Sequence, residues 1–245
     1  MKEKISIKKE ITQNTNRLLE ISGHYSKMYS LRAAIQLIPH IGSSLDTLFA
    51  GAGTNWQLKR LEAFIQDLCR KFEKIDQVMP ELEPNERLFD FVVQVFNEVI
   101  RHRSEEKRKC FANIFVRQIV ERHPWDEAET AARFMAELTE QHVEVLHAIV
   151  ATPACTEGAF QGIRVASIID WDNNTVKQSP LDLRKVFPWF PVLVLKMYMS
   201  ELLARGLLYD EGVNRWATNA FEVFRPTELG DWFITWVRSS MDINK

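Results

Sequence analysis

The chain has 245 residues, enough for one large or two small domains with a buried core. Its 46% hydrophobic and 26% charged residues are typical of a soluble globular protein, and only nine Gly and nine Pro argue against long disordered or all-β stretches. The net charge is −2, and residues 141–245 carry 10 Lys and Arg against 12 Asp and Glu, which argues against a duplex-binding module there.

The first part of the chain is predicted to be helical. Apolar residues recur at spacings of three, four and seven from Ile7 to Ile21, and a second helical stretch runs from about Tyr25 to Leu37. Residues 33–53 are apolar, rich in Gly and Ser, and carry one formal charge, Asp46. They form either buried core or a membrane-perturbing hairpin. The polar side chains among them favour the core, because such groups are costly in hydrocarbon.

The clearest helix covers residues 56–79, where apolar residues recur at spacings of three and four between charged ones. Residues 88–100 predict a second helix with apolar side chains on two faces. Ser104 is the predicted N-cap of a third helix, because two glutamates follow it in the first turn. Pro124 ends that helix, and a single long helix is then predicted from Asp126 to Ile149.

The last third of the chain carries the most informative pattern. A helix near 192–205 ends at Gly206, a short apolar strand follows, an acidic glycine turn lies at 210–212, and residues 221–230 supply a returning strand and a capped helix. This order is typical of a winged helix. Such modules bind nucleic acid or protein without chemistry, so the pattern predicts a protein that is not an enzyme.

We place a domain boundary at the end of the long helix, near Thr152 and Pro153. The fold class is therefore predicted to be mainly α. An N-terminal helical bundle of about five or six helices occupies residues 1–150. A winged-helix-like domain with a small β-hairpin occupies residues 151–245.

The helix near 192–205 would be the recognition helix if DNA were the ligand. It offers few side chains that read base edges, and its apolar composition predicts that it is mostly buried. The turn at 210–212 is acidic and would repel phosphate. A winged helix that contacts protein is therefore favoured over a DNA-binding regulator.

One concentrated basic stretch stands out in the sequence. Four of its side chains are candidates for a nucleic-acid or phosphate contact: Arg103, Lys107, Arg108 and Lys109. Glu105 and Glu106 offset this charge, and helical spacing spreads the basic residues over much of the circumference. The alternative is a solvated face with local ion pairs.

Aromatic residues are frequent in the C-terminal domain. Four of them are candidates for a partner-binding surface: Trp171, Trp189, Phe190 and Trp216. Tryptophan side chains often dominate protein interfaces. The alternative is that these residues complete the core of a small domain.

No motif in the sequence supports catalysis, a cofactor or a metal. His142 and His147 are five residues apart, whereas a helical zinc pair needs four. The segment 51–53 lacks the third glycine of a dinucleotide-binding loop. Asp170 and Asp172 lie in a predicted loop. We therefore predict no enzyme activity, no cofactor and no metal site.

The three cysteines, Cys69, Cys110 and Cys155, are odd in number, far apart and without metal-ligand spacing. This usage suits a reduced interior in which each thiol acts as a small hydrophobic group. No apolar run follows the charged N-terminus, so no secretory signal is expected. We predict a cytoplasmic protein.

A further pattern begins at Lys107 and covers about half of the chain. Its segments are Phe111-Ala112-Asn113-Ile114, Phe134 with Leu138, Val145-Leu146, Leu202–Leu207 and Phe224–Phe233. In these segments the chain resembles the bacterial abortive-infection alpha proteins. The resemblance implies a cytosolic bacterial protein with a role in phage defence, and it brings no catalytic residues with it.

Together these features predict a non-catalytic protein-interaction module, a sensor or adaptor in bacterial antiphage defence. A winged-helix DNA-binding regulator is one alternative, and a membrane-perturbing effector acting through residues 33–53 is another. We expect a protein partner, while charge disfavours nucleic acid and polar residues disfavour a membrane. Homo-oligomerisation through helices of the N-terminal half is a further expectation.

Overall fold

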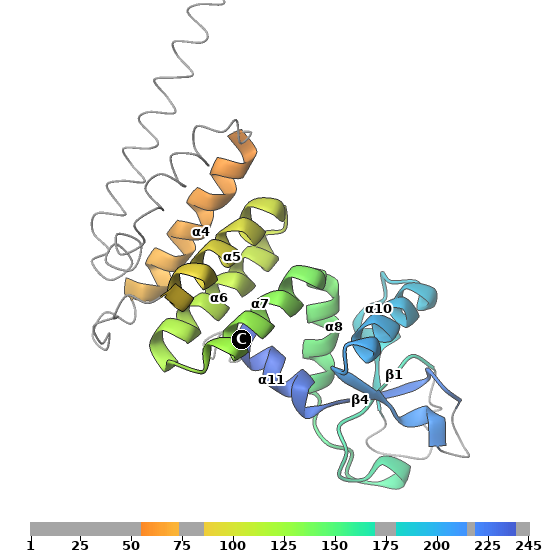
Figure 1. Ribbon diagram of the computed structural model, residues 1–245. Helices are drawn as coiled ribbons and strands as arrows, with labels where there is room; N and C mark the ends of the chain where they lie inside the picture. The colour runs from red at the N-terminus through yellow and green to blue at the C-terminus, as the bar shows by residue number, and fades with distance from the viewer. Residues whose placement is uncertain (1–54, 74–85, 170–179, 215–218, 239–245) are drawn as a thin grey trace, which may run out of the picture. The chain divides into compact units, whose positions relative to one another are not determined.

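The computed structural model describes residues 55–73, 86–169, 180–214 and 219–238 (Figure 1). Over these residues the chain is mainly helical, as the sequence predicts, and it holds one small four-stranded sheet. The chain divides into two compact units, residues 1–132 and 133–245. This division falls inside a helix, and the domain boundary near residue 150 stays a prediction.

Several predicted features lie outside the described residues. They are the helices and the apolar segment before residue 54, the end of the helix at 56–79, and the loop that holds Asp170 and Asp172. Among the helices that are described, none is both long and apolar enough to cross a membrane. The membrane alternative, which concerns residues 33–53, therefore stays a prediction.

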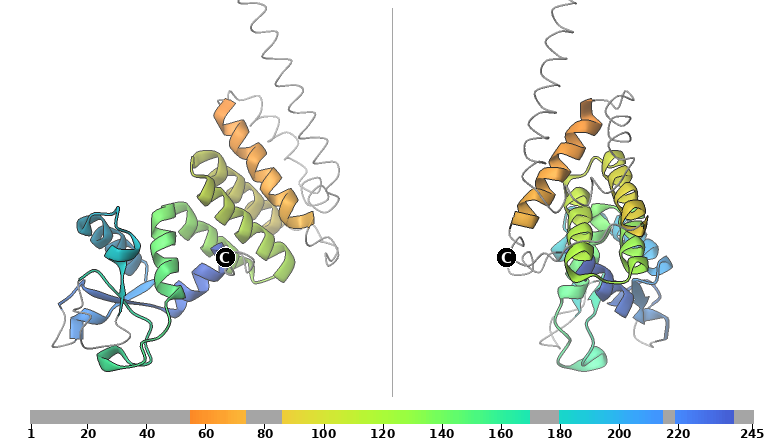
Figure 2. Two further views of the ribbon diagram at one scale, coloured as in Figure 1. Left: turned by 180° about the vertical axis from the view of Figure 1, so that it is seen from behind. Right: turned by 60° about the vertical axis from the view of Figure 1, so that its left-hand side comes forward.

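The described part of the first unit holds three complete helices: α4 (Asn55–Glu73), α5 (Glu86–Arg101) and α6 (Glu105–Glu121). They pack against one another and lie side by side in both views of Figure 2. Their apolar stripes meet in a core that holds Phe64, Phe91 and Phe115, all fully buried. The rings of Phe91 and Phe115 stack with centroids 6.0 Å apart.

The predicted N-cap of α6 is confirmed. Ser104 is extended, and its hydroxyl oxygen accepts a hydrogen bond from the main-chain N–H of Lys107 at 3.1 Å. At the other end Arg122 takes a left-handed conformation with φ of 53°. Its main-chain N–H donates to the carbonyl of Gln118, which ends the helix before Pro124.

The prediction of one long helix from Asp126 to Ile149 is wrong. Two helices occupy this span, α7 (Trp125–Glu137) and α8 (Glu140–Ala151). Thr139 separates them, because its hydroxyl accepts from the N–H of His142 while the His142 ring accepts from the N–H of Thr139. This reciprocal capping box starts a new helix although the apolar spacing continues through it.

The sheet of the second unit has the strand order β2-β1-β4-β3. Its strands are β1 (Ala166–Ser167), β2 (Leu181–Asp182), β3 (Leu208–Asp210) and β4 (Val223–Pro226). The predicted hairpin is confirmed: β3 and β4 are antiparallel, with Leu208 opposite Pro226 and Asp210 opposite Phe224. The sequence did not indicate β1, which pairs in parallel with β2 and antiparallel with β4.

Three longer helices surround this sheet: α8, α10 (Val192–Ala204) and α11 (Glu228–Val237). Short helical segments fill the connections: η1 (Gly158–Phe160), α9 (Leu183–Val186) and η2 (Glu211–Asn214). Thr227 caps α11 by accepting from the N–H of Gly230 at 3.0 Å. The carbonyl of Leu207 approaches Gly230 so closely that an added Cβ would lie 2.2 Å from its oxygen.

Candidate functional site

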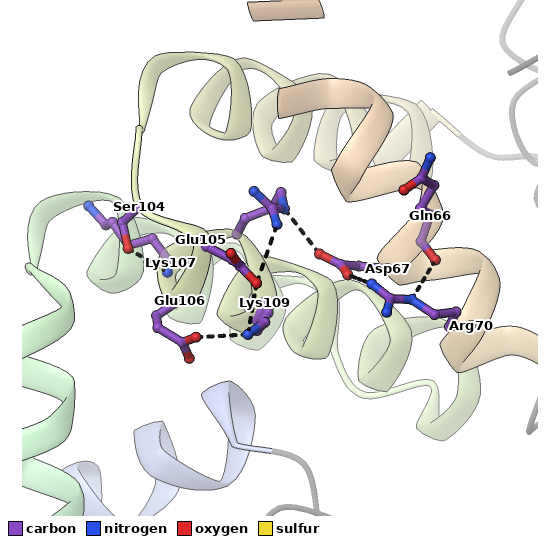
Figure 3. A network of polar contacts seen from close by, with 9 residues as sticks. Gln66, Asp67, Arg70, Ser104, Glu105, Glu106, Lys107 and Lys109 are labelled. Carbon is purple, nitrogen blue, oxygen red and sulfur yellow. Dashed lines mark hydrogen bonds and ion pairs between the residues drawn. The ribbon is translucent and has the colours of Figure 1, made fainter. Parts of the chain in front are cut away.

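The basic stretch at the start of α6 is largely paired within the first unit (Figure 3). The Arg108 side chain is only 14% exposed, and its Nε donates to Oδ2 of Asp67 on α4 at 3.0 Å. The other carboxylate oxygen of Asp67 accepts from Arg70. Arg108 therefore ties α6 to α4 instead of facing solvent.

Lys107, the second basic candidate, is 6% exposed. Its Nζ lies 3.3 and 3.4 Å from the two ring nitrogens of His102, which precedes α6. Oε2 of Glu98 lies 3.2 Å from Nε2 of the same ring. Burial, followed by the positive charge of Lys107, lowers the pKa of His102, so the ring stays neutral at neutral pH. The side chain of Lys107, on α6, thus packs against the connection between α5 and α6.

Lys109, the third basic candidate, pairs with both glutamates of the first helical turn. Its Nζ lies 2.8 Å from Oε1 of Glu106 and 3.1 Å from Oε1 of Glu105. These contacts raise the pKa of Lys109, and the contact with Lys109 lowers the pKa of Glu105. Arg103 is exposed. The geometry is that of local ion pairs, and a phosphate contact by these four residues stays a prediction.

Two of the predicted partner-binding aromatics, Trp189 and Phe190, lie together between α9 and α10. The buried ring of Phe187 lies 5.7 Å from that of Trp189 and 5.9 Å from that of Phe190, measured between centroids. Tyr198 on α10 also contacts Phe190, at 5.4 Å. Trp189 is nevertheless 64% exposed. Its neighbours hold it in place without covering it. Trp171 and Trp216 lie outside the described residues.

The prediction that the helix near 192–205 is mostly buried is wrong. Only three of the thirteen residues of α10 are buried, namely Leu195, Met199 and Leu202. The opposite side is exposed along its whole length, with Leu193 78% and Met197 50% accessible. We call this side the α10 face; its residues are Val192, Leu193, Lys196, Met197, Ser200, Glu201 and Ala204.

The α10 face is the feature that sequence reasoning missed. Residues 192–199 are apolar around nearly the whole helix, a pattern that ordinarily indicates burial on all sides. The same pattern arises when one side packs on a core and the other awaits a partner. The signal was therefore present, in an apolar run wider than one buried stripe needs.

Two polar contacts anchor α10 to the neighbouring helices of its unit. Nε2 of the buried His142 lies 3.0 Å from Oε2 of Glu201. Arg205, just after α10, pairs with Glu137 at the end of α7. Both contacts lie near the C-terminal end of α10. They fix the rotation of the helix about its axis, and with it the residues that face solvent.

The acidic turn at 210–212 has a structural role that the sequence did not reveal. Asp210 is buried, and its two carboxylate oxygens accept from the main-chain N–H groups of Gly212 at 2.9 Å and Phe221 at 2.8 Å. Glu211 pairs with Arg225 at 2.5 Å. Both carboxylates of the predicted acidic turn are therefore used inside the hairpin, and its repulsion of phosphate stays a prediction.

In the part of the chain that is described, no group of three or more His, Cys, Asp and Glu side chains is arranged to hold a metal ion. His142 and His147 both lie on α8, five residues apart, and His142 is part of the capping box. Cys110 and Cys155 are buried free thiols. Burial raises the pKa of Cys155, which keeps it protonated and weakly nucleophilic.

Comparisons of the chain with protein-family models, curated proteins and solved structures found no match. The relationship to abortive-infection alpha proteins therefore stays a prediction. The basic stretch is paired internally, whereas the α10 face presents apolar side chains to solvent, and Trp189, three residues before α10, is exposed as well.

Proposed function

We propose that this chain is a non-catalytic protein-interaction module that binds a protein partner through the α10 face and Trp189. The observation that supports this best is the joint exposure of Leu193, Met197 and Trp189 on one short segment. Apolar side chains gathered at a surface are typical of protein contact sites, and Trp is enriched among residues that dominate binding.

We also propose that the second unit is a winged helix. In support, α8, β1, α9, α10, β3 and β4 follow one another in the order of that fold, and the sheet order β1-β4-β3 places the last strand in the centre. β2 is then an added edge strand. In this arrangement α10 is the recognition helix, the element that such modules present to a ligand.

The alternative of a DNA-binding regulator is supported by the same element order. The residues on the α10 face argue against it, because Lys196 is the single basic side chain among them. Base readout relies on several Arg, Lys, Asn or Gln side chains in the groove. A protein ligand fits the face better.

The biological setting that we propose, a sensor or adaptor in bacterial antiphage defence, is supported by the resemblance of segments such as Leu202–Leu207 and Phe224–Phe233 to abortive-infection alpha proteins. In that setting the module would link a signal of infection to an effector. Its contribution would be recognition and not chemistry.

The test is capture of partners by the tagged full-length chain from bacterial lysate near physiological salt. Leu193→Asp places a charge in the α10 face, and we expect it to reduce capture of the wild-type partner by about tenfold or more. Val213→Asp is the matched control, because Val213 is an exposed apolar residue outside that face, and it should leave capture unchanged.

Two outcomes would overturn the proposal. In the first, both variants capture the same proteins as the wild-type chain. In the second, the wild-type chain retains nucleic acid whose affinity falls steeply with salt, the behaviour of a phosphate-binding surface, and this would favour the regulator.

A further inference from the structure

We infer that one occupant of the α10 face is a second copy of this chain, with the two α10 helices packed in parallel. This inference rests on the proposed function, because it assigns a partner to the same surface.

The exposed residues of α10 follow the spacing of a coiled-coil seam. Leu193, Met197, Ser200 and Ala204 are separated by four, three and four residues. At 3.6 residues per turn they therefore form one narrow line along the helix. These side chains are apolar or small, and all are exposed. The seams of two copies can therefore pack knobs into holes, as in a coiled coil. In heptad notation Leu193 and Ser200 are at d and Met197 and Ala204 at a, and Leu at d favours parallel dimers.

Charged residues flank this seam on both sides. Lys196 lies on one side and Glu201 on the other, at the g and e positions of the same register. In a parallel pair, a g residue meets the e residue that lies five positions further along the second helix. Lys196 would therefore meet Glu201 of the second copy, and the twofold axis repeats the contact. In an antiparallel pair the two charges lie on opposite sides of the seam.

Both charges are accessible for this contact. Lys196 is exposed, and within its own chain its charge interacts with that of Glu222. Glu201 is 46% exposed although its Oε2 lies near His142. The carboxylate of Glu201 lies between His142 and solvent, and complementary charges then select the parallel orientation.

The contact is small, which sets its strength. A seam of four residues falls below the roughly 800 Å² that each partner of a standard interface buries, so we expect a dissociation constant on the order of micromolar. The unit already holds α10 as a helix, so association does not have to nucleate it. A dimer of this strength can exchange its second copy for a different partner.

The test measures the oligomeric state of the full-length chain by sedimentation velocity over a dilution series. We expect a concentration-dependent dimer. Lys196→Glu and Glu201→Lys should each raise its dissociation constant about tenfold or more, because each places like charges opposite one another. An equimolar mixture of the two variants should dimerise as well as the wild-type chain, since both ion pairs are then restored. Lys185→Glu, an exposed charge outside α10, is the control.

A second variant tests the register independently. Ser200→Cys places two thiols opposite each other at a d position, and mild oxidation should cross-link the dimer, while the wild-type chain under the same oxidant should not cross-link. This readout does not depend on Glu201, whose replacement also removes the contact with His142.

The possible failures of the dimer and of the proposed function are distinguishable. If the wild-type chain is a monomer at every concentration while Leu193→Asp still abolishes capture of another protein, the dimer is wrong and the proposed function stands. If a dimer forms but persists in Lys196→Glu, Glu201→Lys and Leu193→Asp, the contact lies on another face and the inference is overturned. A mixture that does not restore association would equally exclude the parallel register.

Discussion

His147 lies half-buried on α8, where burial, followed by the positive charge of Arg238, lowers its pKa below the ordinary value of 6.5. The His147 ring therefore binds a proton less tightly in the folded chain than in the unfolded chain. The resulting contribution to stability is complete above pH 6.5 and is lost as the pH falls through the lowered pKa of the folded state.

We expect the free energy of unfolding to fall below pH 6.5 and to fall less steeply in the His147→Gln variant. Urea unfolding followed by circular dichroism at several pH values measures both slopes. His102 also has a lowered pKa and acts in the same direction, so the diagnostic quantity is the difference between variant and wild type. Equal slopes would show that His147 does not contribute.

The ion pair between Asp67 and Arg108 is the second residue-scale feature with a measurable consequence. Both side chains are largely buried. Asp67→Ala leaves the Arg108 guanidinium without its carboxylate, and we expect the loss to be about 3 kcal/mol of unfolding free energy. Replacing both residues, as in Asp67→Leu with Arg108→Met, should recover much of it, because no buried charge remains.

Glu106→Ala is the control for this pair. Glu106 pairs with Lys109 at an exposed position, so its removal should change stability by less than about 1 kcal/mol. Chemical denaturation of Asp67→Ala, of the double variant and of Glu106→Ala measures the three changes in unfolding free energy. If Asp67→Ala unfolds like Glu106→Ala, the pair between α4 and α6 does not stabilise the first unit.

At the scale of elements, the approach of α11 to the chain after α10 depends on Gly230. In an ordinary helix, replacing Gly with Ala stabilises by roughly 0.5–1 kcal/mol. Here the added Cβ would lie 2.2 Å from the carbonyl oxygen of Leu207. We therefore expect Gly230→Ala to destabilise by about 1–3 kcal/mol, which reverses the sign.

Thr235→Ala on the exposed side of α11 is the comparison for Gly230→Ala. It should be neutral or slightly stabilising, because Ala has the higher helix propensity. Thermal and urea unfolding of both variants give the two signs. A stabilised Gly230→Ala variant would mean that α11 can move away from Leu207 at little cost.

Helices whose apolar residues recur regularly over several turns were predictable. Elements whose bounds depend on a single contact were not. The helix spacing predicted α4, α5 and α6, and Ser104 indicated where α6 begins. The break between α7 and α8 was missed because His142 closes the Thr139 capping box, a position where Glu or Gln is the usual signal. β1 and β2 have two residues each, too few to show an alternating pattern.

The candidate site could be predicted only in part, because the packing of segments that are distant in the sequence decides which side chains are exposed. Arg108 looked available for a ligand because its partner Asp67 lies 41 residues away in the sequence. Composition identified Trp189 and Phe190 as candidates. Leu193 and Met197 were assigned to the core, because an apolar residue has the same identity whether it faces a core or a partner. Only the packing of the chain separates these cases.

The central place of β4 in the sheet has a consequence for biosynthesis. β1, β3 and β4 belong to one sheet, but β4 is the last of them to leave the ribosome, and it joins the other two. Until residues 223–226 emerge, β1 and β3 have no strand between them, and their main-chain groups stay unpaired on those edges. The second unit therefore completes its sheet late in translation. A nascent chain paused before β4 would expose strand edges that invite association with other chains.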